Sequence, residues 1–202
     1  MNKHERYSKQ KYDSIANNYD TSADGRFTAK FKGKMAELAD VSDGDSVLDV
    51  GCGNGKLLSE ISRKADVKAY GIDVSPNMIE VCRQRYKGID FKTASGERLS
   101  FDDDSFDLLT ICCVLHHINN PGKFFEEARR VLKVGGALIV GDPWFPFGAK
   151  QFAEHIVFPL LKAGDNLLFS HKKLKALFIR NGFTITEIYK KGSVQIIKGR
   201  KQ

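Results

Sequence analysis

Short apolar runs alternate along this chain with longer amphipathic stretches. The apolar runs predict strands at 46–50, 67–72, 89–93, 106–113 and 137–141. The run at 106–113 is continuous, which is typical of a central parallel strand that is covered on both faces.

Between these runs, apolar residues recur at helical spacing or follow helix-start signals. Phe27, Phe31 and Met35 share one face of a helix predicted at 26–40. Ser75 followed by Pro76 pairs a preferred N-cap residue with a preferred first-turn residue. The remaining helices are expected at 55–64, 76–86, 121–134, 151–162 and 171–181.

This alternation predicts an α/β fold: a Rossmann-like, doubly wound, mostly parallel sheet of about seven strands, with helices on both faces. Runs at 183–190 and 193–198 flank Lys191-Gly192, which predicts a tight turn and a C-terminal antiparallel hairpin. We expect one domain over 1–202. Its parts are an N-terminal lid segment at 1–45, a cofactor-binding core at 46–141, a substrate-cover insertion at 142–170, and a C-terminal helix with the hairpin at 171–202.

The turn after the first strand carries the clearest chemical signal, because Gly51, Gly53 and Gly55 alternate there. Glycine lets the backbone come close to a ligand, since no Cβ intervenes and positive φ costs little. The helix that follows points unpaired N–H groups at the same place. Asp73 ends the second strand about 20 residues later, where a carboxylate can accept both hydroxyls of a ribose. The sequence therefore predicts a cofactor that contains a nucleoside.

Glycine spacing indicates which cofactor. A dinucleotide fingerprint reads G-x-G-x-x-G, and Lys56 stands where its third glycine would fall, which disfavours a nicotinamide-dependent reductase. Asp49 precedes the glycines, and a carboxylate there opposes a pyrophosphate but suits an ammonium or sulfonium group.

The pattern Asp-x-Gly-x-Gly-x-Gly at 49–55 resembles the first motif of class I S-adenosylmethionine (SAM) methyltransferases. The whole resemblance covers residues 12–194 and is greatest for the small-molecule group that includes the ubiquinone/menaquinone-biosynthesis C-methyltransferases. Six segments carry it in the order of that group: 12–20, 47–57, 71–78, 94–101, 106–118 and 132–138.

The resemblance implies SAM as cofactor, S-adenosylhomocysteine as product, and a role for each matching position. Asp49 and the backbone of Gly51 and Gly53 would hold the methionine end. Asp73 would hold the ribose hydroxyls. The further implied contacts are Val74 and Met78 on the adenine, Ser95, Gly96 and Glu97 at its edge, Cys52 in the glycine turn, the Cys112 backbone beside the methionine ammonium, and Tyr19 as a cover. Ser95 replaces the aspartate that this group usually carries, so that contact is expected to be weaker.

Methyl transfer needs a well-placed nucleophile, and it needs a base only where the nucleophile starts protonated. His116, His117 and Tyr19 are the candidate bases. The two histidines follow the fourth strand, and imidazole titrates near neutral pH, so it can deprotonate a phenol or a thiol. The alternative is that the two histidines only pack at a strand–helix junction.

The composition of the chain indicates the cellular compartment in which we expect it. The four cysteines form no C-x-x-C pair, which favours reduced thiols in a cytosol and argues against a zinc site. No apolar run approaches the roughly 20 residues that span a bilayer. The polar N-terminus lacks the apolar region of a signal peptide. We therefore expect a cytoplasmic protein.

The net charge of +7 is concentrated after residue 170, where lysines and arginines far outnumber acids. This basic face is either a solvated surface or a contact for an anionic substrate or a peripheral anionic surface. Asp142-Pro143-Trp144 resembles a D-P-P-[YW]-like motif that clamps the amine of a nucleic-acid base. It follows the fifth strand instead of the fourth and lacks the second proline, which argues against nucleic acid. Trp144 and Phe145 instead suggest an apolar wall.

We therefore expect a methyltransferase that acts on a small aromatic or apolar molecule. Two alternatives stay open. One is a nucleic-acid or protein methyltransferase that uses the basic C-terminal face. The other is a non-catalytic SAM-binding module, because no single general base is obvious.

Overall fold

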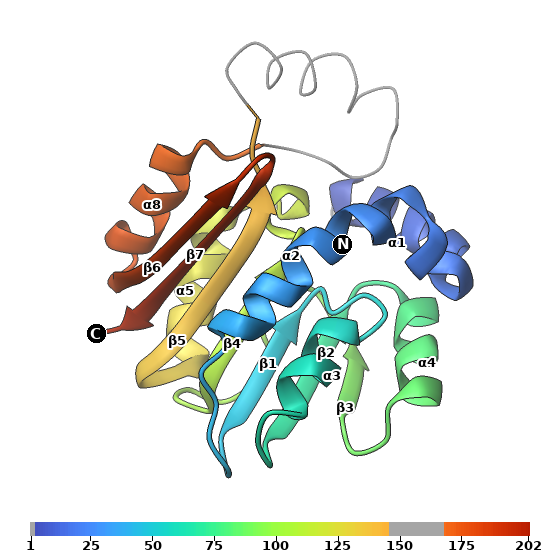
Figure 1. Ribbon diagram of the computed structural model, residues 1–202, viewed down its shortest axis with the longest axis horizontal. Coiled ribbons are helices and arrows are strands. Elements are labelled where there is room, and N and C mark those ends of the chain that lie inside the picture. Colours follow the sequence, from blue (N-terminus) through green and yellow to red (C-terminus); the bar gives the residue numbers. More distant parts are fainter. Residues whose placement is uncertain (1–2, 146–167) are drawn as a thin grey trace.

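The computed structural model describes residues 3–145 and 168–202 (Figure 1). Its centre is a seven-stranded sheet in the order β3-β2-β1-β4-β5-β7-β6. The parallel strands are β1 Ser46–Val50, β2 Lys68–Asp73, β3 Asp90–Thr93, β4 Phe106–Cys112 and β5 Leu132–Pro143. β6 Phe183–Lys191 and β7 Val194–Lys201 form the antiparallel hairpin, with β7 paired to β5. The predicted fold class is confirmed.

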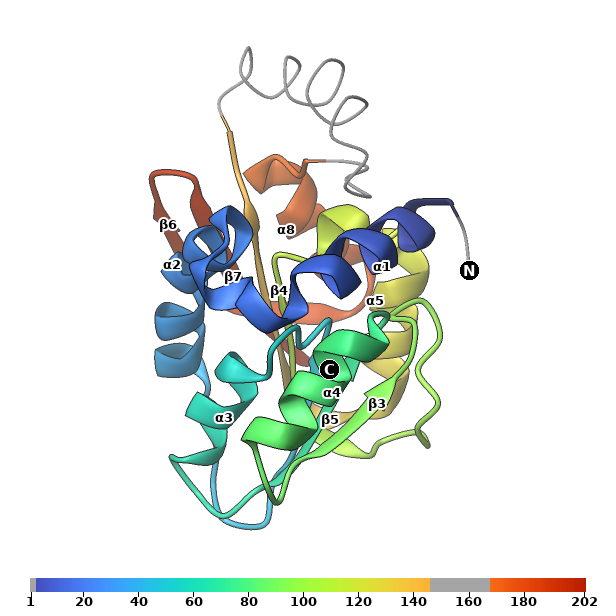
Figure 2. The same cartoon turned by 90° about the vertical axis from the view of Figure 1, so that its right-hand side faces the viewer.

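Helices cover both faces of this sheet. Apolar side chains of α2 (Ala23–Leu38), α3 (Lys56–Ser62) and α4 (Pro76–Arg85) pack on one face. Those of α5 (Pro121–Val131) and α8 (His171–Arg180) pack on the other. Figure 2 shows α2 and α3 on one side of the sheet and α5 on the opposite side. Because β1 to β5 are parallel, their carboxyl ends lie at one common edge of this covered sheet.

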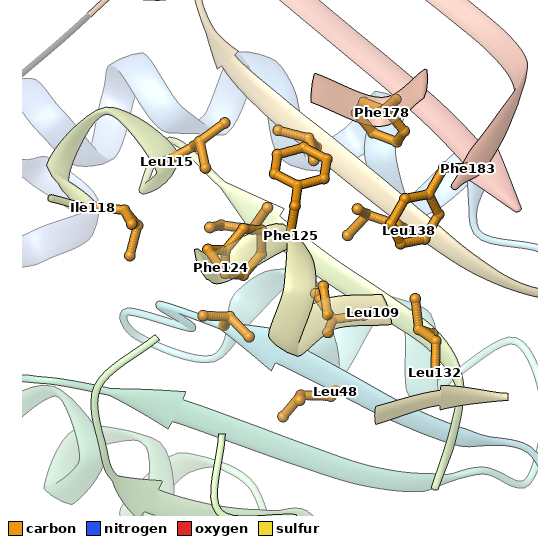
Figure 3. Close-up of a cluster of buried hydrophobic side chains, with 14 of the residues drawn as sticks. Leu48, Leu109, Leu115, Ile118, Phe124, Phe125, Leu132, Leu138, Phe178 and Phe183 are labelled. Carbon is orange, nitrogen blue, oxygen red and sulfur yellow. The ribbon is translucent and has the colours of Figure 1, made fainter. Parts of the chain in front are cut away.

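The α5–α8 face is held by a cluster of aromatic side chains (Figure 3). Phe125 of α5 meets Phe178 of α8 edge to face, with ring centroids 5.2 Å apart. Phe124 and Phe183 are also buried there. Burying one such ring stabilises a fold by about 1.5–3 kcal/mol. The cluster joins α5, which packs on β5, to α8, which packs on β6 and β7.

Capping residues begin two of the helices. Ser75 Oγ accepts a hydrogen bond from Met78 N at 3.1 Å, and Asn120 Oδ1 accepts one from Lys123 N at 3.1 Å. The helix predicted from residue 26 begins earlier, at Ala23, because Ser22 caps it. The helix predicted at 151–162 lies outside the described residues.

Two boundaries near the C-terminus differ from expectation. The hairpin turn is Gly192–Ser193, because Lys191 is already paired with Val194, so the predicted turn at Lys191-Gly192 was wrong by one residue. Gly192 has a φ of 57° and supplies the left-handed position that a tight hairpin turn needs. β5 also continues past Gly141 to Pro143, since β7 pairs with it there. This extension places Asp142 on a strand.

The N-terminal segment lies across the carboxyl edge of the sheet (Figure 2). It consists of α1 (Lys3–Ile15) and a 3₁₀ helix, Ala16–Thr21. Asp13 of α1 accepts a hydrogen bond from Ser75 Oγ at 2.6 Å, which ties α1 to the start of α4. Among the helices of the described residues, none has both the length and the apolar character that crossing a bilayer requires.

Candidate active site

A cavity opens at the carboxyl ends of β1 and β2, and α1 forms its outer wall. We call it the first cavity. Among the residues predicted to bind the cofactor, Gly51, Asp73, Val74 and Gly96 line it. The other lining residues are Glu5, Ser8 and Tyr12 of α1, Val50, Ala94, Val114, His117 and Ile118. Residues from five separate segments of the sequence therefore meet at the predicted edge of the sheet.

The glycine turn has the backbone shape that its sequence predicts. Gly51, Gly53 and Gly55 have φ angles of 69°, 53° and 77°. A Cβ on Gly51 would lie 2.3 Å from Val114 Cγ2, so only glycine fits there. A Cβ on Gly53 would meet nothing nearer than Tyr19 Cε1, at 4.0 Å. The main chain at Gly53 is therefore accessible for close approach by a ligand.

Asp73 is held at the end of β2 by the glycine turn. Its Oδ2 accepts from Gly53 N and its Oδ1 from Ser75 N, each at 2.9 Å. Burial raises the pKa of Asp73, and these backbone hydrogen bonds act in the opposite direction. A carboxylate has about four lone-pair sites, so two backbone donors leave Asp73 able to accept from a ligand as well.

Asp49 lies at the end of β1, almost completely buried. It accepts a hydrogen bond from Thr110 Oγ1 at 2.7 Å. Burial raises the pKa of Asp49 to about 7, while Thr110 and the charge of Lys32 lower it. Burying an anion is costly unless it gains a partner. Asp49 does not line the first cavity, and its contact with the methionine ammonium stays a prediction.

Tyr19 covers the glycine turn from the N-terminal segment. Its hydroxyl lies 3.1 Å from Thr28 Oγ1, and its ring packs edge to face with Tyr12, with centroids 6.2 Å apart. Burial raises the pKa of Tyr19, so its phenol stays protonated near neutral pH. This makes Tyr19 a poor proton acceptor and favours the covering role over the catalytic one.

Three other predicted contacts lie back from the first cavity. Met78 is fully buried in an apolar cluster with Ala16 and Tyr19. Cys52 and Cys112 are buried in the core on the α2–α3 face. None of these three side chains lines the first cavity, and their contacts with a cofactor stay predictions.

The loop after β3 is held by hydrogen bonds to α1 and to the segment before α5. Ser95 Oγ donates to the Glu5 carboxylate of α1 and accepts from Glu97 N at 3.2 Å. The Glu97 carboxylate accepts from Asn119 N at 2.7 Å. Glu97 therefore links the loop to the start of α5, and contacts of Ser95 and Glu97 with adenine stay predictions.

A second cavity adjoins the first, and its volume is about 180 Å³. Tyr12 lines both cavities and stands between them. The second cavity is walled by apolar and polar side chains: Lys11, Tyr12, Asp24, Phe27, Thr28, Cys113, His116, Pro143, Phe145 and Leu168. Phe145 belongs to the apolar wall that the sequence suggested.

A histidine pair separates the two cavities. His116 lines the second cavity and His117 the first, and their ring centroids are 4.1 Å apart. His116 Nδ1 lies 2.8 Å from Asp142 Oδ1, and both side chains are buried. A carboxylate accepts from Nδ1–H, and in that tautomer Nε2 is the basic nitrogen. His117 Nε2 lies 3.3 Å from the Tyr12 hydroxyl.

Asp142 is the site residue that sequence reasoning missed. The pairing of Cys112 with Gly141 brings the end of β5 beside the end of β4, and His116 follows within one 3₁₀ turn, Leu115–His117. Both strands were expected to end at the same edge, but the sequence did not show that β5 continues as far as Asp142. Glu5 and Ser8 were missed for another reason, since nothing local shows where α1 docks.

Residues 48–140 match a protein-family model described as a methyltransferase domain. The methyltransferase GfsG of Streptomyces halstedii is 36% identical over 115 residues, which are 54% of this chain and 41% of that protein. The demethylmenaquinone methyltransferase of Paenarthrobacter aurescens is 32% identical over 153 residues, which are 72% of this chain and 60% of that protein. The chain thus spans less than two thirds of the length of either relative.

A solved structure shares the fold over nearly the whole chain. It is a methyltransferase in complex with the Haloferax volcanii Trm112 methyltransferase activator, at a TM-score of 0.79 and 20% identity, covering 94% of this chain and 96% of that one. The family match runs from β1 to β5, which includes the glycine turn and Asp73. Residues 48–140 therefore match the methyltransferase domain family, and the chain shares its fold with the compared methyltransferase structure.

Proposed function

We propose that the chain transfers a methyl group from SAM to a small-molecule acceptor, with the cofactor in the first cavity and the acceptor in the second. One observation carries this proposal: the glycine turn and Asp73 face a cavity that meets a second, largely apolar cavity at Tyr12. The printed names of the relatives support the same class, since one is a demethylmenaquinone methyltransferase.

The residues present fit the cofactor. Asp73 would accept the ribose hydroxyls, and Asp49 would face the methionine ammonium. SAM, when bound, supplies a methyl group that its sulfonium makes electrophilic. The chain's own task is then to place the acceptor and exclude water, and such positioning supplies roughly 7–11 kcal/mol of a barrier. Glu5, Ser8 and Tyr12 of α1 line the outer side of the first cavity and would shield a bound ligand from water on that side.

His116 would take a proton from an acceptor hydroxyl or thiol. Asp142 would hold the imidazole in the required tautomer and stabilise the cation that forms. Its carboxylate is fully buried, and its Oδ1 lies 2.8 Å from His116 Nδ1. A histidine held this way by a buried acid favours a catalytic protein over a non-catalytic SAM-binding module. The apolar second cavity likewise favours a small acceptor over a nucleic acid.

Substitution of Asp73 tests the cofactor site. We expect Asp73→Ala to weaken the binding of S-adenosylhomocysteine by about 1–3 kcal/mol, because ribose hydroxyls would lose a charged acceptor. Titration calorimetry measures this directly. Asp90→Ala is the matched control, since Asp90 is an exposed acid on neighbouring β3, paired with Lys92 at 2.9 Å. Equal affinity of the folded Asp73→Ala variant and the wild type would exclude the role assigned to Asp73.

Asp49 gives a pH dependence with a definite sign. Its pKa of about 7 leaves it largely protonated below pH 7, whereas the ionised form suits the ligand ammonium. S-adenosylhomocysteine affinity should therefore rise as pH increases from about 6 to about 7.5, and binding near pH 6 should release protons. Without ligand, the raised pKa stabilises the fold at low pH, and this contribution is lost as pH rises through about 7.

Calorimetry in buffers of different ionisation enthalpy measures the released protons. Asp49→Asn should remove the pH slope. If the slope survives in that variant, the titrating group is a different one.

The reaction itself is tested with SAM that carries a labelled methyl group and a protein-free extract of small molecules. We expect label to enter an extractable small molecule with the wild-type chain. Label that appears only in nucleic acid or protein, when whole extract is supplied, would contradict the proposed acceptor class.

A further inference from the structure

Lys32 is a buried cation that the proposed mechanism leaves unused. It lies on α2 with only 7% of its surface exposed. Its Nζ donates to Asn54 Oδ1 at 3.3 Å and lies 5.2 Å from the centroid of the Tyr19 ring. Asn54 belongs to the glycine turn, and Tyr19 covers that turn. The ammonium group therefore lies between the glycine turn and the ring that covers it.

Within the described residues, Lys32 forms no ion pair. Lys198 shows the contrast, because it is buried to a similar degree and pairs with Asp40 at 2.5 Å and Glu187 at 3.2 Å. Burying a charge is expensive unless an opposite charge neutralises it. An amide oxygen at 3.3 Å and the face of the Tyr19 ring compensate the charge of Lys32 only in part, so Lys32 is suited to an incoming anion.

Asp49 is the complementary case. It is a buried acid that forms no ion pair within the described part of the chain, and its one side-chain donor is the neutral Thr110. Lys32 is close enough for its charge to lower the pKa of Asp49, yet the two do not pair. One buried cation and one buried anion therefore lie near the glycine turn without forming an ion pair.

We propose that Lys32 binds the carboxylate of the methionine moiety of SAM while Asp49 binds its ammonium group. The two residues form a preformed receptor for a zwitterionic amino acid, and this inference rests on the proposed function.

The order of contacts along the turn supports this placement. Asp73 accepts from Gly53 N, and the next residue, Asn54, contacts Lys32. Asn54 is fixed in orientation, because its Nδ2 donates to Asp20 Oδ1 at 2.6 Å while its Oδ1 faces Lys32. The ribose anchor thus contacts one turn residue, and the proposed carboxylate anchor contacts the next. A ligand held at Asp73 by its ribose would extend its amino-acid end toward Lys32.

The first experiment uses the wild-type chain and two ligands that differ only in the carboxylate. Calorimetry compares S-adenosylhomocysteine with its decarboxylated analogue, which keeps the ammonium group. We expect the analogue to bind about 10- to 100-fold more weakly, as for the loss of one charged hydrogen bond in a buried site. Equal affinities would overturn the proposal. Failure of the wild type to bind S-adenosylhomocysteine at all would overturn the proposed function and this inference with it.

The second experiment compares variants. Lys32→Met keeps the apolar stem and removes the charge, and it should weaken S-adenosylhomocysteine about 10- to 100-fold while leaving the decarboxylated analogue unchanged. Lys32→Arg should restore part of the loss. Lys30→Met, at an exposed lysine of the same helix, should match the wild type. If Lys32→Met weakens both ligands equally, Lys32 only supports the turn and the proposal is wrong.

Discussion

Replacing His116 with glutamine is expected to lower kcat by about 10²- to 10⁴-fold while the affinity for SAM stays unchanged. Glutamine can still donate to Asp142, but it takes up no proton. His116 lines the second cavity, whereas the proposed cofactor contacts lie in the first, so the variant should lose catalysis and keep cofactor binding.

The pH profile distinguishes a base from a structural residue. Wild-type kcat should rise with pH through the titration of the imidazole, and the His116→Gln variant should lose that limb. Asp142→Asn should also reduce kcat, because an amide can no longer hold the protonated imidazole as a carboxylate does. His171→Gln, at the start of α8 and outside both cavities, is the control. An unchanged kcat and pH profile in folded His116→Gln would remove His116 from the mechanism.

Substitution of Gly53 by valine should weaken SAM binding by about 100-fold or more. Gly53 has a φ of 53°, a left-handed conformation that branched residues avoid. Its Cβ position is free of protein atoms to 4.0 Å, so a valine side chain would occupy space that the account assigns to the cofactor. Its N–H also positions Asp73. Calorimetry with S-adenosylhomocysteine measures the loss.

Gly33→Ala is the matched control for this change. Gly33 lies within α2, and no heavy atom stands within 4 Å of its Cβ position. It should bind normally and gain about 0.5–1 kcal/mol of stability, since alanine is the better helix former. Normal binding by folded Gly53→Val would show that the ligand does not approach the turn.

The sequence allowed prediction of features that depend on neighbouring residues. The N-cap at Ser75 and the bounds of β1 follow from local chemistry, and the structure confirms them. The positive φ of the glycine turn follows from the glycines themselves. The conjunction of Gly51, Asp73 and Gly96 in one cavity follows from the rule that parallel strands end at a common edge.

Features that depend on distant contacts were not predictable. Lys32 reads as one more polar position of an amphipathic helix until α2 docks on the glycine turn. Asp142 reads as part of a loop until β7 pairs alongside β5 and extends it. The His116–Asp142 pair joins residues whose proximity depends on the register between β4 and β5. Such distances follow from packing, which periodicity does not encode.

Titration of the purified chain with S-adenosylhomocysteine and, separately, with NADH tests the central claim most directly. The account predicts binding of S-adenosylhomocysteine at one site per chain and none of NADH. At a ligand concentration about 100 times its Kd, S-adenosylhomocysteine should raise the free energy of unfolding by about 2.7 kcal/mol. A properly folded chain that shows neither heat of binding nor thermal stabilisation with S-adenosylhomocysteine would contradict it.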